Sequence, residues 1–191
     1  MRFFRTIALV CGMLAILGIR ASAGPFVVFP QAGEFASPDG HYVLRSVEDQ
    51  GSAGEFRGTF RALWLTETLT GRSRKLCDYV GEAAVAWSKN NILLITVYVS
   101  KKTSRAMIVS AADHEEGMII DVPALIQMVP PELRAPLREN DHVFVEASLL
   151  EENRLHLRVW GYGRHDPNGF HWACQYEIGS AKISCGARPA P

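Results

Sequence analysis

The sequence lacks the short motifs that mark the common catalytic and cofactor-binding sites. It contains no Gly-rich phosphate loop, no Gly-x-Ser-x-Gly elbow and no His-Glu-x-x-His motif. Each of these motifs places a phosphate, a nucleophile or a metal on a particular turn or helix. Their absence removes the usual routes to a nucleotide-binding protein, a hydrolase or a zinc enzyme. The sequence therefore predicts no cofactor, and an enzyme is the less favoured class.

Dense clusters of positive charge are also missing. The nearest candidate, residues 72–75, reads Arg-Ser-Arg-Lys and fits a solvated strand end better than a phosphate-binding patch. The whole chain has 20 Lys and Arg against 20 Asp and Glu. Nucleic-acid-binding proteins normally show a basic face or stripe, so the composition argues against nucleic acid as a partner.

The longest apolar run is too short for a membrane-spanning helix. It covers residues 6–19, between Arg5 and Arg20, whereas a helix needs about 20 apolar residues to cross a bilayer. Basic residues precede this run, and the small residues 21–23 follow it. This order is typical of a signal peptide over residues 1–23 that is removed during export.

Cleavage before Gly24 predicts a periplasmic or secreted protein in which residues 24–191 form a single β-rich domain. No membrane span would remain after cleavage. The predicted peptide carries three arginines and no acidic residue, so the mature chain is slightly acidic. Its length is sufficient to bury a sizeable core without help from a metal.

Three cysteines follow the predicted cleavage site: Cys77, Cys174 and Cys185. In an oxidising compartment a disulfide is expected to form and to leave one thiol over. Two strand-like segments flank a two-residue turn at Gly179-Ser180, and in that register Cys174 faces Cys185. The same register places the pair at a hydrogen-bonded position, where the Cα atoms lie farther apart. The Cys174–Cys185 pairing therefore stays open, since sequence alone does not fix disulfide connectivity.

A repeated unit is the strongest positive signal in the sequence. Residues 35–44 (FASPDGHYVL) and 85–94 (VAWSKNNILL) both run from an apolar segment through Ser and three turn-type residues into an apolar strand. Each continues as a meander of about four short strands rich in Val, Ile, Leu, Trp and Tyr. We expect copies over about 35–83, 84–121 and, more faintly, 143–187, with a helical connector over 121–140.

The segments around these copies also have predictable roles. Asp121 is the expected N-cap of the connector, Pro123 suits its first turn, and Pro130-Pro131 starts a second short helix. The apolar residues 24–29 are expected to add an edge strand.

The first two copies resemble the blade repeat of TolB-like β-propellers. The resemblance lies in residues 37–40 (Ser-Pro-Asp-Gly), in Trp87-Ser88, and in residues 63–65 followed by Thr70-Gly71. It implies a mainly β fold with about three antiparallel, four-stranded, propeller-blade-like meanders and one short helical insertion. Propellers close with four or more blades, so three blades would form an open stack. Exposed strand edges in such a stack favour self-association. Separate stacked blades would keep Cys77 too far from Cys174 and Cys185 to bridge either, and would leave it a buried thiol.

Two function classes follow. TolB-like repeats serve as recognition scaffolds, so the resemblance implies a binding or protein-interaction module in the periplasm or cell envelope, with a protein partner. The alternative is a small secreted metal-dependent or hydrolytic enzyme that uses His165, Asp166 and His171, three residues around one tight turn. The turn-forming sequence Asp-Pro-Asn-Gly explains that segment without a metal. We interpret the charged turn at residues 114–116 as solvated, and all four tryptophans as packed in the core.

Overall fold

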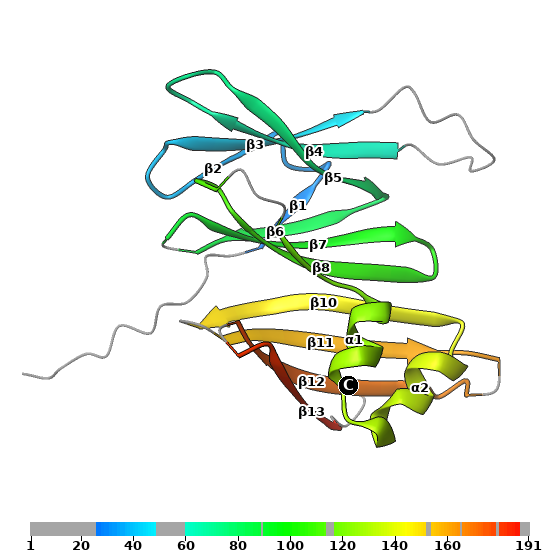
Figure 1. Cartoon of the computed structure of the whole chain (residues 1–191). Helices are drawn as coiled ribbons and strands as arrows, with labels where there is room; N and C mark the ends of the chain where they lie inside the picture. Colours follow the sequence, from blue (N-terminus) through cyan, green and yellow to red (C-terminus); the bar gives the residue numbers. More distant parts are fainter. Residues whose placement is uncertain are drawn as a thin grey trace, which may run out of the picture.

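The computed structural model describes residues 26–48, 60–88, 90–113, 117–151, 154–164, 166–178 and 180–187. The predicted signal peptide and the charged turn at residues 114–116 lie outside these ranges. The fold is mainly β, with two sheets and two short α-helices (Figure 1). No helix in the described residues is long and apolar enough to cross a membrane.

The first four-strand meander forms a sheet of its own. Its strands pair in chain order and antiparallel: β2 (Glu34–Ala36), β3 (Tyr42–Glu48), β4 (Phe60–Glu67) and β5 (Ser73–Val80). Leu44, Leu63 and Tyr79 are fully buried on one face of this sheet. The other face carries both polar and apolar side chains, among them Arg45, the exposed Val47 and the partly buried Trp64.

The remaining nine strands form one mixed sheet. The second meander contributes β6 (Ala83–Trp87), β7 (Ile92–Ser100), β8 (Thr103–Ser110) and β9 (Met118–Ile120), and β1 (Val27–Phe29) adds to the free edge of β6. The third meander contributes β10 (His142–Glu151), β11 (Arg154–Tyr162), β12 (Phe170–Glu177) and β13 (Lys182–Ala187). The edge strand expected before Pro30 is thus confirmed, with three residues paired to β6.

The expectation of three separate blades is wrong, because the second and third meanders join through β8 and β10. These two strands run parallel and share a single backbone bridge, Val143 to Thr103. Side-chain hydroxyls extend this junction. The Ser104 hydroxyl accepts from the Val145 N–H at 2.9 Å and donates to the Val145 carbonyl at 3.0 Å. The Thr96 hydroxyl accepts from the Ala147 N–H at 2.9 Å. Within the described residues the chain therefore forms a four-stranded sheet beside a nine-stranded sheet, without a closed propeller.

Strands β6 to β8 lie between the other two meanders and are buried on both faces (Figure 1). Leu93, Ile95 and Val97 of β7 pack toward the four-stranded sheet. Leu94 on the opposite face packs toward β10 to β12. This burial explains the nearly continuous apolar sequence of β7, since a strand covered on both sides has no face that favours polar residues.

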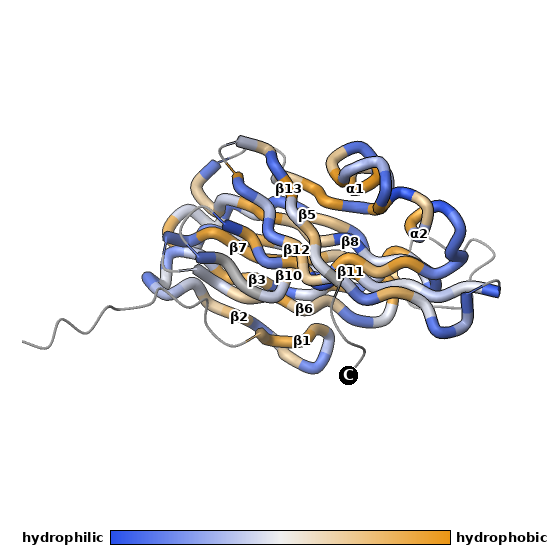
Figure 2. Tube along the Cα trace, turned by 90° about the horizontal axis from the view of Figure 1, so that it is seen from below, coloured by the Kyte–Doolittle hydropathy of each residue, from blue (hydrophilic) through white to orange (hydrophobic). Residues whose placement is uncertain are grey.

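Among the residues that the structure describes, the third meander is covered on only one face. Along β11, buried Leu155, Leu157 and Val159 alternate with more exposed neighbours. Figure 2 shows the mixed hydrophilic and hydrophobic colouring of these strands. Such alternation is typical of a strand with one face in the core and one toward solvent. The second of these faces, formed by β10 to β13, is called the outer face below.

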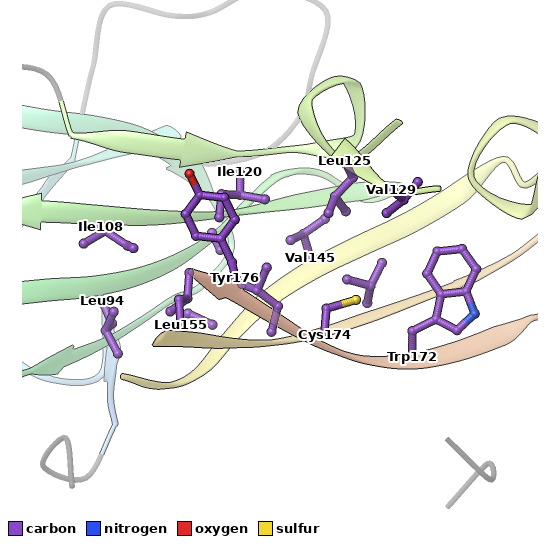
Figure 3. Close-up of a cluster of buried hydrophobic side chains, with 14 of the residues drawn as sticks. Leu94, Ile108, Ile120, Leu125, Val129, Val145, Leu155, Trp172, Cys174 and Tyr176 are labelled. Atoms are coloured by element: carbon purple, nitrogen blue, oxygen red, sulfur yellow. The ribbon is translucent and has the colours of Figure 1, made fainter. Parts of the chain in front are cut away.

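Two short helices close the core of the third meander. Asp121 caps α1 (Val122–Met128) by accepting from the Ala124 N–H at 2.9 Å, as expected. A 3₁₀ turn, η1 (Pro131–Leu133), and α2 (Arg134–Glu139) follow. Leu125 and Val129 lie over Val145 and Trp172 (Figure 3). The helical segment is therefore a connector packed over the sheet, which confirms that prediction.

The Cys174–Cys185 disulfide is present, and Cys77 is a buried free thiol. The predicted register is also correct, because Cys174 and Cys185 are direct partners across β12 and β13. The loop between the strands is longer than the predicted two-residue turn, because β12 ends at Glu177 and β13 begins at Lys182. Gly179 of that turn lies outside the described residues. The two cysteine Cα atoms are 4.1 Å apart, the spacing of a non-hydrogen-bonded pair. The pair therefore does not occupy the hydrogen-bonded position, with its wider Cα spacing, that the two-residue turn predicted.

Candidate functional site

Five aromatic side chains gather on the outer face of β10 to β12. They form two adjacent rows across the strands, and we call them the aromatic face: His142, Phe144, Trp160, Tyr162 and His171. The pairing of β10, β11 and β12 brings them together, because side chains at opposed positions of neighbouring strands lie on the same face.

The rings of the aromatic face stand nearly parallel. His142 and Tyr162 stack with centroids 4.5 Å apart, and Phe144 and Trp160 stack at 4.1 Å. His171 continues the second row, 6.1 Å from Trp160 with the ring planes 7° apart. Phe144 is buried at the base of the cluster, whereas Tyr162 is 41% exposed. The stacked rings thus form an ordered aromatic surface that is partly exposed to solvent.

Glu146 fixes this surface from the adjacent row. Its carboxylate accepts from the Trp160 indole N–H at 3.2 Å and from the Tyr98 hydroxyl at 3.4 Å. The guanidinium of Arg158 lies 3.0 Å from the second carboxylate oxygen. Burial, followed by the charge of Glu146, raises the pKa of Tyr98, so Tyr98 remains a neutral donor. Three side chains on two other strands are therefore held by one carboxylate.

A groove lies on the same face beside Glu146. It has a volume of about 500 Å³, and we call it the outer groove. Its lining includes Ser148, His156, Arg158, Ala173, Gln175, Ser184 and Gly186. Arg158, Ala173 and Gly186 occupy one row across β11 to β13. Ala173 and Gly186 follow each other in that row, so its β12 and β13 positions carry no long side chain and leave a hollow beside Arg158.

The outward face of the first meander has a different character. Ion pairs flank the partly buried Trp64: Arg45 lies 2.7 Å from Glu34, and Lys75 lies 2.6 Å from Asp78. Such exposed pairs are typical of a solvated surface and contribute little to stability. A second cavity of about 360 Å³ borders this sheet, but its Arg74 donates to the Ser110 carbonyl at 2.7 Å and has a structural role. The outer face of the third meander is therefore the better candidate for recognition.

The predicted metal loop has other roles where it is described. Asp166 closes its turn by accepting from the Gly169 N–H at 3.0 Å, and His171 belongs to the aromatic face. His165 lies outside the described residues. In the part of the chain that the structure describes, no group of three His, Cys, Asp or Glu side chains is arranged to hold a metal ion.

The turn at residues 37–41 also brings a serine, an aspartate and a histidine together. Ser37 donates to Asp39 at 2.6 Å, and His41 Nδ1 lies 3.1 Å from the same carboxylate. The bond from Ser37, with a second from the His41 N–H, lowers the pKa of Asp39 to about 2. In a catalytic triad the histidine must accept the serine proton. Here the carboxylate lies between them, so the group stabilises the turn.

The sequence analysis missed the aromatic face because it placed all four tryptophans in the core. Trp87 and Trp172 are buried, with 3% and 7% of their surface exposed, as expected. Trp64 and Trp160 are only partly buried. The alternation of apolar and polar residues along 154–162 could have predicted an outward Trp160, because it places Trp160 on the same face as Arg154, His156 and Arg158.

No family model matches the chain. Comparisons with curated proteins and with solved structures give no match either. The site is therefore interpreted from its own chemistry.

Proposed function

We propose that the protein is an exported binding module that recruits a protein partner through the aromatic face. The aromatic rows carry the proposal: Trp160 and Tyr162 stack with each other and are more exposed than the buried Phe144, and Glu146 accepts a hydrogen bond from Trp160. Trp, Tyr and Arg are the residues that contribute most to protein–protein binding energy. Because the rings are already ordered, little side-chain entropy is lost on binding.

The place of the aromatic face in the fold supports a protein as the occupant. The β6 to β8 strands have a sheet or a sheet with helices against each face. In the described parts of the chain the third meander has such cover on one side only, and its other side carries aromatic rows where the first meander carries ion pairs. A flat surface built from neighbouring strands matches another protein surface in shape better than it matches a small ligand.

The cellular location is part of this proposal. Residues 1–23 read as a signal peptide, and disulfides such as Cys174–Cys185 persist in oxidising compartments. The resemblance of residues 35–121 to TolB-like repeats points toward the same recognition role. A metal-dependent or hydrolytic enzyme has less support, since Asp166 and His171 serve separate structural purposes.

Affinity capture with matched variants tests the proposal. The exported chain is immobilised and exposed to a cell-envelope fraction, in parallel with Trp160→Ala, Tyr162→Ala and Trp64→Ala. Trp64 is the control, because it is a partly buried tryptophan on the first meander, away from the aromatic face. We expect one protein to be retained by the wild type and by Trp64→Ala, and lost with Trp160→Ala and Tyr162→Ala. Equal retention by all four chains would show that the aromatic face is not the binding surface.

A further inference from the structure

The outer groove has the volume of a small-molecule site. Its volume of about 500 Å³ lies within the range of ligand pockets. Ala173 and Gly186, which both line the groove, face each other across β12 and β13. A Cβ atom placed on Gly186 would meet no other atom within 4 Å, so this position is open.

The charges around the groove do not favour an ion. Arg158 is the permanently charged group in the lining, and Glu146 lies 3.0 Å from its guanidinium. His156 Nε2 lies 3.4 Å from a carboxylate oxygen of Glu151. An anion would have to compete with the carboxylates of Glu146 and Glu151 for Arg158 and His156. A cation would find no acidic side chain in the lining. The groove is thus suited to an uncharged ligand.

The polar groups of the groove require a ligand that both donates and accepts hydrogen bonds. Gln175 and Ser184 are direct partners across β12 and β13, and neither side chain has a hydrogen-bond partner within the described residues. Ser148 donates to the His156 carbonyl at 3.0 Å and keeps its lone pairs for a ligand. An amide and two hydroxyls offer donors and acceptors together. Covering them with an apolar ligand would leave polar groups unpaired at a cost.

We propose that the outer groove binds a short, uncharged saccharide. A sugar hydroxyl donates and accepts at the same atom, which matches Gln175, Ser184 and Ser148, while Arg158 supplies further donors at the rim. A peptide that adds a strand to the sheet would bind the free edge of β13, the last strand in the sheet order, whereas this groove lies across the face of β11 to β13. The proposal does not depend on the protein partner inferred above.

Nuclear magnetic resonance titration of the exported chain tests it. The probes are maltose, cellobiose and N,N′-diacetylchitobiose, with inorganic phosphate, glucuronate and an uncharged Gly-Ser peptide in parallel. We expect saturable shifts of the Gln175 and Ser184 amide signals with at least one of the three disaccharides. Gly186→Leu should abolish them by filling the groove. Gln175→Ala should weaken binding about five-fold, the loss expected for one hydrogen bond.

Two matched substitutions separate binding from folding. Arg154→Gln removes a charge from β11, the strand that carries Arg158, at a position outside the groove. Gln127→Ala removes an exposed amide from α1. Both should leave sugar binding unchanged, and all variants should keep the wild-type melting temperature within a few degrees. The proposal is overturned if no disaccharide binds, if phosphate, glucuronate or the peptide binds this groove more tightly, or if folded Gly186→Leu still binds the sugar.

Discussion

Ser37 and Ser88 make the same hydrogen bond in two different sheets. The hydroxyl of Ser37 accepts from the Tyr42 N–H at 3.0 Å, and that of Ser88 accepts from the Ile92 N–H at 3.1 Å. Each serine thus closes the turn that leads into the second strand of its meander. The two turns also touch, because the Asn91 side chain donates to Asp39. The repeated unit is therefore structural, and its serines act on the backbone.

The two serines should differ in their contribution to stability. Ser37 is 5% exposed and also bonds Asp39, so Ser37→Ala should lower the free energy of unfolding by about 1–3 kcal/mol. Ser88→Ala loses fewer buried contacts and should cost about 1 kcal/mol. Urea denaturation measures both, with Ser184→Ala as a control expected within about 0.5 kcal/mol of wild type. A larger cost for Ser88→Ala would contradict this order.

Trp87→Ala should destabilise the fold without affecting the aromatic face. Trp87 is 3% exposed, and its indole N–H lies 3.4 Å from the Phe35 carbonyl. Truncation of a buried tryptophan typically costs about 3–5 kcal/mol. Thermal denaturation followed by circular dichroism should show a much lower melting temperature than for Trp160→Ala. An unchanged melting temperature for Trp87→Ala would show that Trp87 does not contribute to the stability of the core.

The β8–β10 junction should depend on Ser104. Ser104 is fully buried, so Ser104→Ala leaves the Val145 N–H without its partner and should cost about 1–3 kcal/mol. Hydrogen exchange at the Val145 amide should become faster. Thr103→Val is the control, because the Thr103 hydroxyl makes only a long contact of 3.5 Å with the Ser104 carbonyl. Equal exchange of the Val145 amide in Ser104→Ala and wild type would refute a role for this hydroxyl.

Stability should fall at alkaline pH as Cys77 titrates. Burial raises the pKa of Cys77 from 9.0 to about 11. The folded protein holds this proton more tightly than the unfolded chain, so the stabilisation is complete below about pH 9 and is lost as pH rises toward 11. The loss is on the order of 2 kcal/mol. Urea midpoints across this range should fall less steeply in Cys77→Ala. Some slope should remain, because burial also raises the pKa of Tyr79. Parallel curves for the two proteins would contradict the assignment.

Export predicts a defined N-terminus. The small residues 21–23 place signal-peptidase cleavage before Gly24. N-terminal sequencing of the protein from the periplasm or the medium should therefore begin Gly-Pro-Phe. A chain that keeps Met1 would argue against export.

Local patterns were sufficient to predict much of the fold. The Pro-Asp-Gly turn, the Asp121 cap and the cysteine register depend on neighbours in sequence, and each appears as predicted. The β8–β10 junction could not be predicted this way. The role of Ser104 depends on a strand 41 residues away, and nothing around a serine reveals that its hydroxyl will take the place of a backbone partner.

The candidate site was harder to predict than the fold. A tryptophan on a strand can lie in the core or on the surface, and the sequence does not show which until the layers on each side of the strand are known. The alternation of residues 154–162 shows that one face is apolar, but it does not show that Trp160 meets Phe144 from β10 and His171 from β12. Those contacts depend on pairing registers between three strands, which the sequence specifies only through the packed structure.

The hydroxyl-based junction at Ser104 and Thr96 has a consequence for how such a chain can change in length. A continuous backbone ladder forces each added strand to match the spacing of the previous one. Here one bridge and two side chains fasten a complete four-strand module to its neighbour. Few hydrogen bonds would therefore need to be replaced if a whole module were lost, but loss of the third module would also expose the apolar face that carries Leu94. A chain of this kind can therefore shorten by one module only if polar residues replace that face.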